Sequence, residues 1–436
     1  MKNKKVLVYG FKKSGYYVTK LLLKDNDVTV LDKEYDLDSL EKLKILGVKY
    51  KLEDDDINIE EYDLIVRSPG IIPSNEIIKK AHELGIMVTN EVEIAYKYLP
   101  LCHIICITGS NGKTTTTTMI YDILSKVYNN VHLAGNIGYP LSEIAPNVKS
   151  GDIIVMEISD HQLYDIIDFK CNIGVITNLC PTHLDFHGSY ENYKLVKKKV
   201  FNKFTNEDVS ILNYKDKDLL DLTSDIESIK YYFNNEDNYI KDNYIYINNN
   251  KVLNTNDILL KGIHNYENIL ACLLVVKLFN VDTFIIKDYL KKFKGVEHRI
   301  EYVTTSSNNV EFYNDSKSTN PTSTITALKT FNKPIHLILG GFERGQDFNE
   351  LNDYLNNVVC IYAIGEVADR IVDYANSKNI KVVKSIFLTN ALDSIKENVK
   401  ENEVVLLSPA SASWDQYDKF ETRGEEYKNY IAKIFN

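Results

Sequence analysis

The stretch CHIICITGSNGKTT, residues 102–115, decides the fold of this chain. Its apolar half predicts a strand over residues 104–108, and a helical pattern begins near Thr115. Glycines between the two let backbone N–H groups converge on phosphate oxygens, while the helix N-terminus and Lys113 add positive potential. We therefore predict a P-loop for ATP, with contacts from Gly109, Ser110, Asn111, Gly112, Lys113, Thr114 and Thr115.

Polar residues also follow two later apolar runs. Glu157 ends the run at 153–156, where a carboxylate can hold the metal ion of a bound nucleotide. A surface glutamate at a strand end is the alternative. His183 and Asp185 follow the run at 173–178, at the edge where open α/β sheets bind ligands. A solvent-facing loop histidine is the competing interpretation of His183.

Strand-length runs alternate with helical patterns in three series, which begin at VLVY (6–9), CHIICIT (102–108) and EFYNDS (311–316). This alternation is typical of parallel sheets. Because single cores rarely exceed ~250–300 residues, a chain of 436 residues should hold several domains. We predict an α/β fold with three domains: a Rossmann-like domain over 1–98, a central P-loop ATPase-like domain over 99–297 and a Rossmann-like domain over 298–436. The Asn-rich stretch 234–256 predicts a hairpin insertion.

The composition restricts the class of partner. It is 44% hydrophobic and 26% charged with a formal net charge of −10, as in an ordinary globular protein, and the acidic balance disfavours nucleic acid. The N-terminal lysines lead straight into a strand, without a signal-peptide pattern, and no run of ~18 apolar residues is present. We expect a cytoplasmic protein without membrane insertion, whose six cysteines are reduced core residues.

Several motifs together resemble the Mur ligases across nearly the whole chain. They are GSNGKTT, GNIG (135–138), THLDFHGS, GIHNYEN, EHR, NDSKSTNP and LLSPASASWDQYDKFETRG. The family's short GxxGKT loop explains why Ile107 stands where the common P-loop has a glycine. DSKSTNP (315–321) and SPASASWDQYDKFETRG (408–424) point to the D-glutamate-adding branch, and the DNPR-type motif of the diaminopimelate- and lysine-adding branches is not in the sequence.

The resemblance implies a reaction in cytoplasmic peptidoglycan precursor synthesis. ATP phosphorylates the carboxylate of UDP-N-acetylmuramoyl-L-alanine, and the amine of D-glutamate attacks the resulting acyl phosphate. The family also implies two Mg²⁺ ions and a monomer. Both steps gather negative charge, so the site should be rich in fixed cations.

The resemblance also implies roles for single residues. Lys113, His183, Lys197 and Lys317 would be catalytic. Thr114 and Glu157 would hold the first metal, and His183 and a carbamate on Lys197 the second. Further ATP contacts would come from Asn265, Asn268, Arg299 and Asp315. The UDP-substrate would be held by Gly10, Ser14, Gly15, Asp32, Ser68, Gly70 and Asn136. D-Glutamate would be held by Lys317, Thr319, Arg344, Ser413 and Phe420.

Two details qualify this set. Lys194, Lys198 and Lys199 have the pattern of a solvated helix face, and Lys197 differs from them only by the resemblance. Where the family usually has a serine and an aromatic residue before Gln-Leu, this chain has Asp160 and His161. These two residues either tune the substrate contacts or face solvent.

Three rival interpretations remain at this point. Folylpolyglutamate synthase shares the central fold but lacks the roughly hundred residues that precede the P-loop here. A non-catalytic scaffold would not need the set of lysines, Glu157 and His183. A nicotinamide-dependent oxidoreductase would need a glycine where Lys12 interrupts the motif at 10–15.

Overall fold

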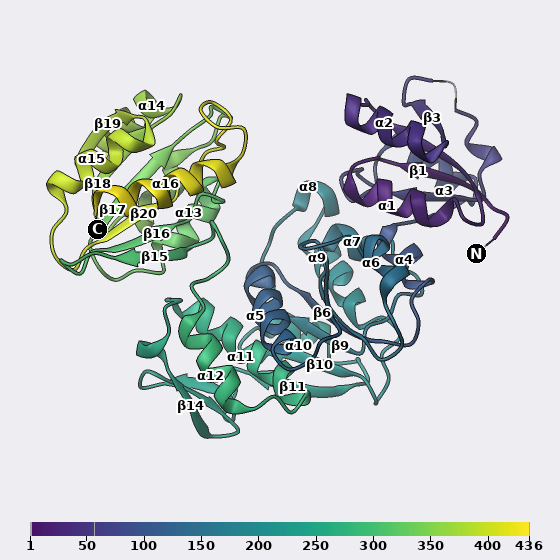
Figure 1. Cartoon of the computed structure of the whole chain (residues 1–436), viewed down its shortest axis with the longest axis horizontal. Coiled ribbons are helices and arrows are strands. Elements are labelled where there is room, and N and C mark those ends of the chain that lie inside the picture. The colour runs from purple at the N-terminus through teal and green to yellow at the C-terminus, as the bar shows by residue number, and fades with distance from the viewer. Residues whose placement is uncertain (1, 56, 436) are drawn as a thin grey trace. The chain divides into compact units, whose positions relative to one another are not determined.

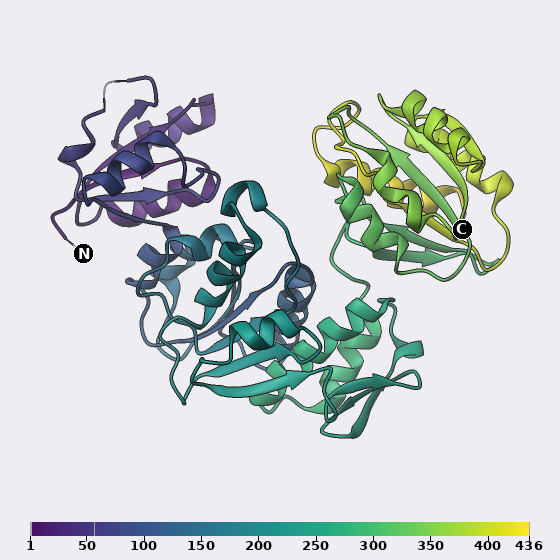
Figure 2. The same ribbon diagram turned by 180° about the vertical axis from the view of Figure 1, so that it is seen from behind.

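The computed structural model describes residues 2–55 and 57–435. By its internal contacts the chain forms two compact units, residues 1–252 with 267–286 and residues 253–266 with 287–436. The described residues build three large sheets, in the N-terminal, central and C-terminal parts of the chain, and one small sheet (Figures 1 and 2). The predicted α/β class with parallel sheets is confirmed. The domain boundaries at 98/99 and 297/298 remain predictions.

The N-terminal sheet has the strand order β3-β2-β1-β4-β5, and all its pairs are parallel. Alternate residues of β1 enter two different cores: Val6 and Val8 pack on one face, Leu7 and Tyr9 on the other. Both faces of the sheet are therefore covered, as in other parallel sheets. The elements are β1 (Lys5–Tyr9), α1 (Lys13–Leu22), β2 (Asp27–Asp32), α2 (Leu37–Leu46), β3 (Lys49–Leu52), η1 (Ile59–Glu61), β4 (Leu64–Arg67), α3 (Glu76–Glu83), β5 (Met87–Thr89) and α4 (Glu91–Tyr96).

The central sheet has the order β11-β10-β9-β6-β8-β7 and is also parallel throughout. Its elements are β6 (His103–Thr108), α5 (Lys113–Ser125), β7 (Val131–Gly135), α6 (Leu141–Ile144), η2 (Ala145–Asn147), β8 (Ile153–Glu157), α7 (Asp160–Tyr164), β9 (Ile173–Ile176), α8 (Leu184–His187), α9 (Tyr190–Lys198), η3 (Lys199–Phe201), β10 (Val209–Asn213), α10 (Lys217–Leu222) and β11 (Ile229–Phe233).

The predicted Asn-rich insertion is confirmed as an antiparallel hairpin. β12 (Tyr239–Lys241) pairs with β13 (Tyr244–Ile247), and β14 (Asn250–Asn254) adds a third strand. Asn243, Asn248 and Asn249 have positive φ angles of 59°, 50° and 61°, which asparagine tolerates better than most residues. After this sheet follow η4 (Thr255–Asp257), α11 (Ile263–Leu278) and α12 (Thr283–Lys292).

The C-terminal sheet has the order β15-β16-β20-β17-β18-β19, in which β15 alone is antiparallel to its neighbour. α13 and α14 contribute to the core on one face, and α15 and α16 to the core on the other. The elements are β15 (Glu301–Thr305), β16 (Glu311–Asn314), α13 (Pro321–Leu328), β17 (Ile335–Gly340), η5 (Phe348–Tyr354), β18 (Val358–Ile364), α14 (Ala368–Ser377), β19 (Val382–Ile386), α15 (Leu388–Asn398), β20 (Val404–Leu407) and α16 (Phe420–Ile434). No helix in the described ranges is both long and apolar enough to span a bilayer.

A buried ion pair fastens the N-terminal sheet to the central one. Arg67, the last residue of β4, donates from Nε to Asp165 Oδ2 over 2.8 Å, and its guanidinium also bonds Ile71 O. The two side chains are 1% and 7% exposed. The guanidinium also lies over the rings of Tyr164 and Phe186. The contact therefore fixes the end of β4 against α7.

We expect Arg67→Leu to lower the free energy of unfolding by about 3–5 kcal/mol, since it leaves a buried carboxylate without its partner. The double variant Arg67→Leu/Asp165→Leu should recover much of that loss, because no buried charge remains. Lys4→Leu, at the exposed pair with Asp63, is the matched control and should change stability by less than about 1 kcal/mol. Urea unfolding measures all three. An equal loss of unfolding free energy in the single and the double variant would contradict the idea that the unpaired buried carboxylate causes the loss.

Candidate active site

The candidate active site lies at the carboxyl ends of β6, β8 and β9. In the parallel register Ile107 pairs with Glu157, and Thr108 pairs with Ile176. The loops that follow these strands therefore emerge at the same edge, which is where open α/β sheets bind ligands.

The predicted P-loop connects β6 to α5. Gly109 has φ +138° and Gly112 has φ +81°, backbone conformations that side chains disfavour. The loop is bound to the segment after β9, because Ser110 N donates to Asn178 O over 2.9 Å and Asn111 N to Asn178 Oδ1 over 3.0 Å. The loop conformation is thus set by strand-edge contacts.

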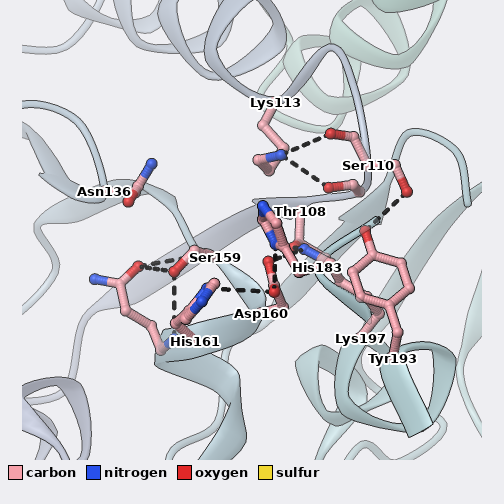
Figure 3. Close-up of polar contacts among 12 residues, drawn as sticks. Thr108, Ser110, Lys113, Asn136, Ser159, Asp160, His161, His183, Tyr193 and Lys197 are labelled. Carbon is pink, nitrogen blue, oxygen red and sulfur yellow. Dashed lines mark hydrogen bonds and ion pairs between the residues drawn. The ribbon is translucent and has the colours of Figure 1, made fainter. Parts of the chain in front are cut away.

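Lys113 and Asn268 complete the loop. Lys113 Nζ donates to the carbonyls of Gly109 and Ser110, each over 2.9 Å, which holds the ammonium above the loop (Figure 3). A Cβ on Gly112 would lie 2.1 Å from Asn268 Oδ1, so Asn268 packs directly against the loop. Thr114 is half-buried in the first turn of α5.

Glu157 faces this edge from the end of β8. It is 1% exposed, and its Oε1 accepts a 2.6 Å bond from Asn136 Nδ2. Its Oε2 is buried and has no hydrogen-bond partner among the described residues. A carboxylate oxygen in that position is suited to a cation. The alternative of a surface glutamate does not fit this burial.

Lys197 is fully buried, which separates it from the neighbouring lysines. Its Nζ donates to Thr108 Oγ1 over 3.0 Å and to Asp160 Oδ1 over 3.3 Å (Figure 3). Burial, helped by the charge of Lys113, lowers the pKa of Lys197 to about 7 despite the opposing charge of Asp160. Lys194, Lys198 and Lys199 are only half-buried.

Asp160 lies at the centre of a cluster of side chains that was not predicted from the sequence. It is 2% exposed. Its Oδ2 lies 2.8 Å from His183 Nδ1, 2.8 Å from His187 Nε2 and 3.3 Å from His161 Nδ1. Burial alone would raise the pKa of Asp160, but the bonds from His161 and His183 and the charge of Lys197 hold it well below its usual range. The idea that Asp160 faces solvent is wrong.

His183 reaches the cluster through an unusual backbone. It precedes α8 with φ +51°, a left-handed conformation that costs a non-glycine residue about 1–3 kcal/mol. Two backbone hydrogen bonds offset this conformational cost, since the N–H groups of Phe186 and His187 both donate to His183 O. The sequence signal for the cluster was the pair Asp160 and His161, which replaces the family's usual serine and aromatic residue, together with His187, one turn after His183.

The residues predicted to hold UDP gather in part around the end of β1. Gly10 has φ +95°, and a Cβ there would lie 2.6 Å from Ser68, whose Oγ donates to Gly10 O over 2.9 Å. Gly15 packs against the same carbonyl, and Asp32 Oδ2 accepts a 2.6 Å bond from Phe11 N. Ser14 is half-buried nearby in α1, and Gly70 lies in the turn after β4. Asn136 instead contacts Glu157 in the central sheet.

In the second unit, Asp315 is buried among protein groups. Its Oδ1 accepts from Ile300 N over 3.1 Å and its Oδ2 from Ser408 Oγ over 2.7 Å. Burial raises the pKa of Asp315 to about 6. Each carboxylate oxygen of Asp315 thus accepts one hydrogen bond from a protein group, and the predicted ATP contact of Asp315 stays a prediction.

The predicted D-glutamate residues have mixed environments. Ser413 is 1% exposed, and its Oγ has no hydrogen-bond partner among the described residues. Arg344 is exposed and lies over the ring of Trp414, 5.2 Å from its centroid. Phe420 begins α16 and contacts the ring of His298 edge-on. Lys317, Thr319 and Arg299 are half-buried, and Asn265 is buried.

The fold and this strand edge define an α/β protein with a phosphate-binding loop. Residues 107–276 match the Mur ligase middle domain, and residues 298–411 match the Mur ligase glutamate ligase domain. A protein of Staphylococcus epidermidis (strain ATCC 12228 / FDA PCI 1200) named UDP-N-acetylmuramoylalanine--D-glutamate ligase is 40% identical over 441 residues, which covers 98% of this chain and 96% of that protein. Its namesake in Staphylococcus aureus (strain MRSA252) is 39% identical over 435 residues, with the same coverage.

This chain belongs to the Mur ligase family, and the predicted resemblance is confirmed. Solved structures agree at the level of the fold. MurF from Acinetobacter baumannii superposes with a TM-score of 0.61 at 16% identity, over 92% of this chain and 91% of that one. MurF from Thermotoga maritima in complex with ADP gives 0.58 at 18% identity, over 99% and 96% of the two chains.

Gly109→Ala tests the P-loop geometry. A Cβ at residue 109 would lie 2.1 Å from Thr177 Oγ1 and 3.1 Å from the backbone nitrogen of Thr177, so the loop must shift. Displacements of about 1 Å at a phosphate site can cost about 100-fold in turnover, and we expect a loss of that size. Gly47→Ala is the control, since its φ is +61° and nothing lies within 4 Å. ATP turnover within twofold of the parent in Gly109→Ala would disprove the argument.

Proposed function

We propose that the chain joins D-glutamate to UDP-N-acetylmuramoyl-L-alanine with cleavage of ATP to ADP and phosphate, in cytoplasmic peptidoglycan precursor synthesis. The observation that carries the proposal is the convergence of Lys113, Glu157 and Lys197 at one sheet edge, in a chain about 40% identical to relatives named for this reaction. A monomer, suggested only by the family resemblance, is part of the proposal.

The first step transfers the terminal phosphoryl group of ATP to the alanyl carboxylate. An oxygen–phosphorus bond forms to the carboxylate, and the bond to ADP breaks. The backbone N–H groups of the loop and Lys113 would stabilise charge on the phosphates, because they are fixed before the ligand arrives. Asn268, packed against Gly112, supports the same loop. The rest of the nucleotide is proposed to contact Asn265, Arg299 and Asp315.

The residues present fit a magnesium ion. Glu157 Oε2 is buried and without a partner among the described residues, and the Thr114 hydroxyl lies in the first turn of α5. Oxygen ligands of this kind suit Mg²⁺. When bound, the ion would neutralise charge on the phosphate oxygens. His183 is proposed as a ligand of a second ion.

In the second step the amine nitrogen of D-glutamate forms a bond to the acyl carbon, phosphate departs with its oxygen, and the amine loses a proton. Lys317 is proposed at this centre. Arg344 offers a planar fork for the distal carboxylate, and Trp414 holds the guanidinium from one side. Ser413 Oγ, which has no hydrogen-bond partner in the part of the chain that the structure describes, is a further donor for D-glutamate, and Thr319 and Phe420 complete the proposed pocket.

The UDP group is proposed to bind around the end of β1. Gly10, Ser68 and Asp32 are already linked there by hydrogen bonds to backbone groups. The tight approach of Gly15 to Gly10 O excludes any larger side chain. Ser14, Gly70 and Asn136 are the remaining proposed contacts.

Lys197 is proposed to take up carbon dioxide as a carbamate. Its burial and its position between Thr108 and Asp160 favour a specific chemical role over a solvated one. A carbamate would convert an ammonium into an oxygen ligand for a cation.

The direct experiment is phosphate release from ATP with magnesium and UDP-N-acetylmuramoyl-L-alanine, comparing D-glutamate with L-glutamate, D-aspartate, L-lysine and diaminopimelate. Release that depends on D-glutamate, with a product heavier by one glutamyl residue, is the expected result. Phosphate release with another amino acid would change the amino-acid substrate that we assign. No phosphate release with any of the five amino acids would favour a non-catalytic protein.

Lys113→Ala should lower the D-glutamate-dependent turnover by at least about 1000-fold, since a fixed cation on the phosphates is lost. Circular dichroism and the thermal midpoint should stay unchanged. Lys126→Ala, at the other end of α5, is the control and should keep full activity. Normal turnover in Lys113→Ala would reject the mechanism.

Lys197→Ala should lose at least about 100-fold in turnover and regain several-fold with formate, acetate or propionate, which can stand in for the carbamate oxygens. Lys199→Ala should show no such rescue, because Lys199 bonds the backbone oxygen of Tyr164 instead. A lack of rescue in Lys197→Ala would remove the carbamate and leave the ligase assignment intact.

A further inference from the structure

More histidine ring nitrogens surround one carboxylate oxygen of Asp160 than that oxygen can accept hydrogen bonds from in good geometry. Three ring nitrogens, from His161, His183 and His187, lie 2.8–3.3 Å from the single atom Asp160 Oδ2. A carboxylate oxygen offers about two lone-pair directions. One ring nitrogen therefore has a poor hydrogen-bond acceptor. A cation bound between these side chains would instead be coordinated by the lone pairs of the ring nitrogens and of the carboxylate oxygen.

The spacing of these atoms suits a metal ion. One ligand atom each from Asp160, His161 and His183 lies within 4.8 Å of the others. Ligands about 2.0–2.2 Å from a common ion are separated by roughly 3 Å, and the distances from Asp160 Oδ2 to the two rings are 2.8 and 3.3 Å. Little side-chain movement is needed to enclose an ion.

We propose that Asp160, His161 and His183 bind a borderline divalent transition metal of the Zn²⁺ or Co²⁺ type. Two imidazoles and one carboxylate form a ligand set that leaves open positions for substrate oxygens, and imidazole favours such metals over Mg²⁺. The oxygen ligands Glu157 and Thr114 form a separate site of the kind that Mg²⁺ prefers. The two sites thus differ in chemistry at the same sheet edge.

The surroundings hold the ligands in place. His187 and Lys197, both fully buried, lie 2.8 Å from Asp160 Oδ2 and 3.3 Å from Asp160 Oδ1, which orients the carboxylate. The ring of His161 packs against Phe186, with centroids 4.1 Å apart. Figure 3 shows His161 and His183 pointing toward Asp160 from two different segments. A carbamate on Lys197 would place a second anion beside Asp160, which a bound cation would offset.

A catalytic role for this ion rests on the proposed function, because the ion would then lie beside the reacting phosphate. Binding itself is measured without substrates. Tag-free protein is stripped with a chelator and titrated with Co²⁺ in the presence of millimolar Mg²⁺. Visible d–d absorption reports the nitrogen ligands, and elemental analysis gives the stoichiometry. We expect one Co²⁺ per chain, displaced by Zn²⁺ but not by Mg²⁺.

Asp160→Ser/His161→Phe, which restores the usual family pattern, should weaken Co²⁺ binding by at least about 30-fold and abolish the d–d bands. Asp160→Asn keeps the side-chain size and should also weaken binding, which guards against a misfolded double variant. His132→Gln removes a histidine–aspartate pair outside the cluster, in which His132 Nε2 lies 2.8 Å from Asp152 Oδ2, and this variant should bind Co²⁺ as the parent does. Equal Co²⁺ affinity in the parent and the double variant, or displacement of Co²⁺ by Mg²⁺, would overturn the proposal.

The two proposals fail separately. D-Glutamate-dependent turnover with Mg²⁺ alone, in a chain that binds no Co²⁺, would reject the transition-metal site and keep the ligase. Stoichiometric Co²⁺ binding without turnover on any amino acid would reject the ligase and keep the metal site.

Discussion

Parallel pairing of β6 with β8 and β9 is the constraint on which the site depends. Parallel strands carry their carboxyl ends to one edge, and the register aligns Ile107 with Glu157 and Thr108 with Ile176. Segments distant in sequence therefore supply the phosphate loop, a carboxylate and a histidine loop to the same place. α9 then brings Lys197 beneath that edge, where it meets Thr108. A change of register by one residue would turn the strand side chains Thr108 and Glu157 to the opposite face of the sheet.

Strands buried on both faces could be predicted from the sequence, and several edge strands could not. The interior strands β1, β6, β8 and β17 are continuous apolar runs, which is the pattern of a parallel sheet covered by helices. β3, β11 and β19 lie at sheet edges, carry exposed charged or polar residues and were not identified. The phosphate loop was predictable for a different reason, since its glycines and lysine are local in sequence.

The cluster at Asp160 shows what local reasoning cannot supply. Lys197 stands in a run of lysines, and nothing in the spacing of that run distinguishes the one buried ammonium from its half-buried neighbours. Its burial follows from the position of α9 against β6, a tertiary fact. Asp160 and His161 were visible only as departures from a family pattern. Their partners His183 and His187 come from another loop, so the cluster exists only once β8 and β9 pair on either side of β6.

Charge burial explains why this edge is organised before any ligand binds. An isolated buried ion is costly, yet Asp160 and Lys197 pair with one another, Thr108 accepts a bond from Lys197, and three histidine nitrogens surround Asp160 Oδ2. Among the residues that the structure describes, Glu157 has a hydrogen-bond partner, Asn136, for one of its two carboxylate oxygens and none for the other. The unsatisfied oxygen thus marks where the fold leaves an interaction to be completed by a cation, while the satisfied pair fixes the geometry around it. Groups held in this way need little reorganisation when charge develops on a transferring phosphoryl group, and that is the condition under which electrostatic stabilisation is most effective.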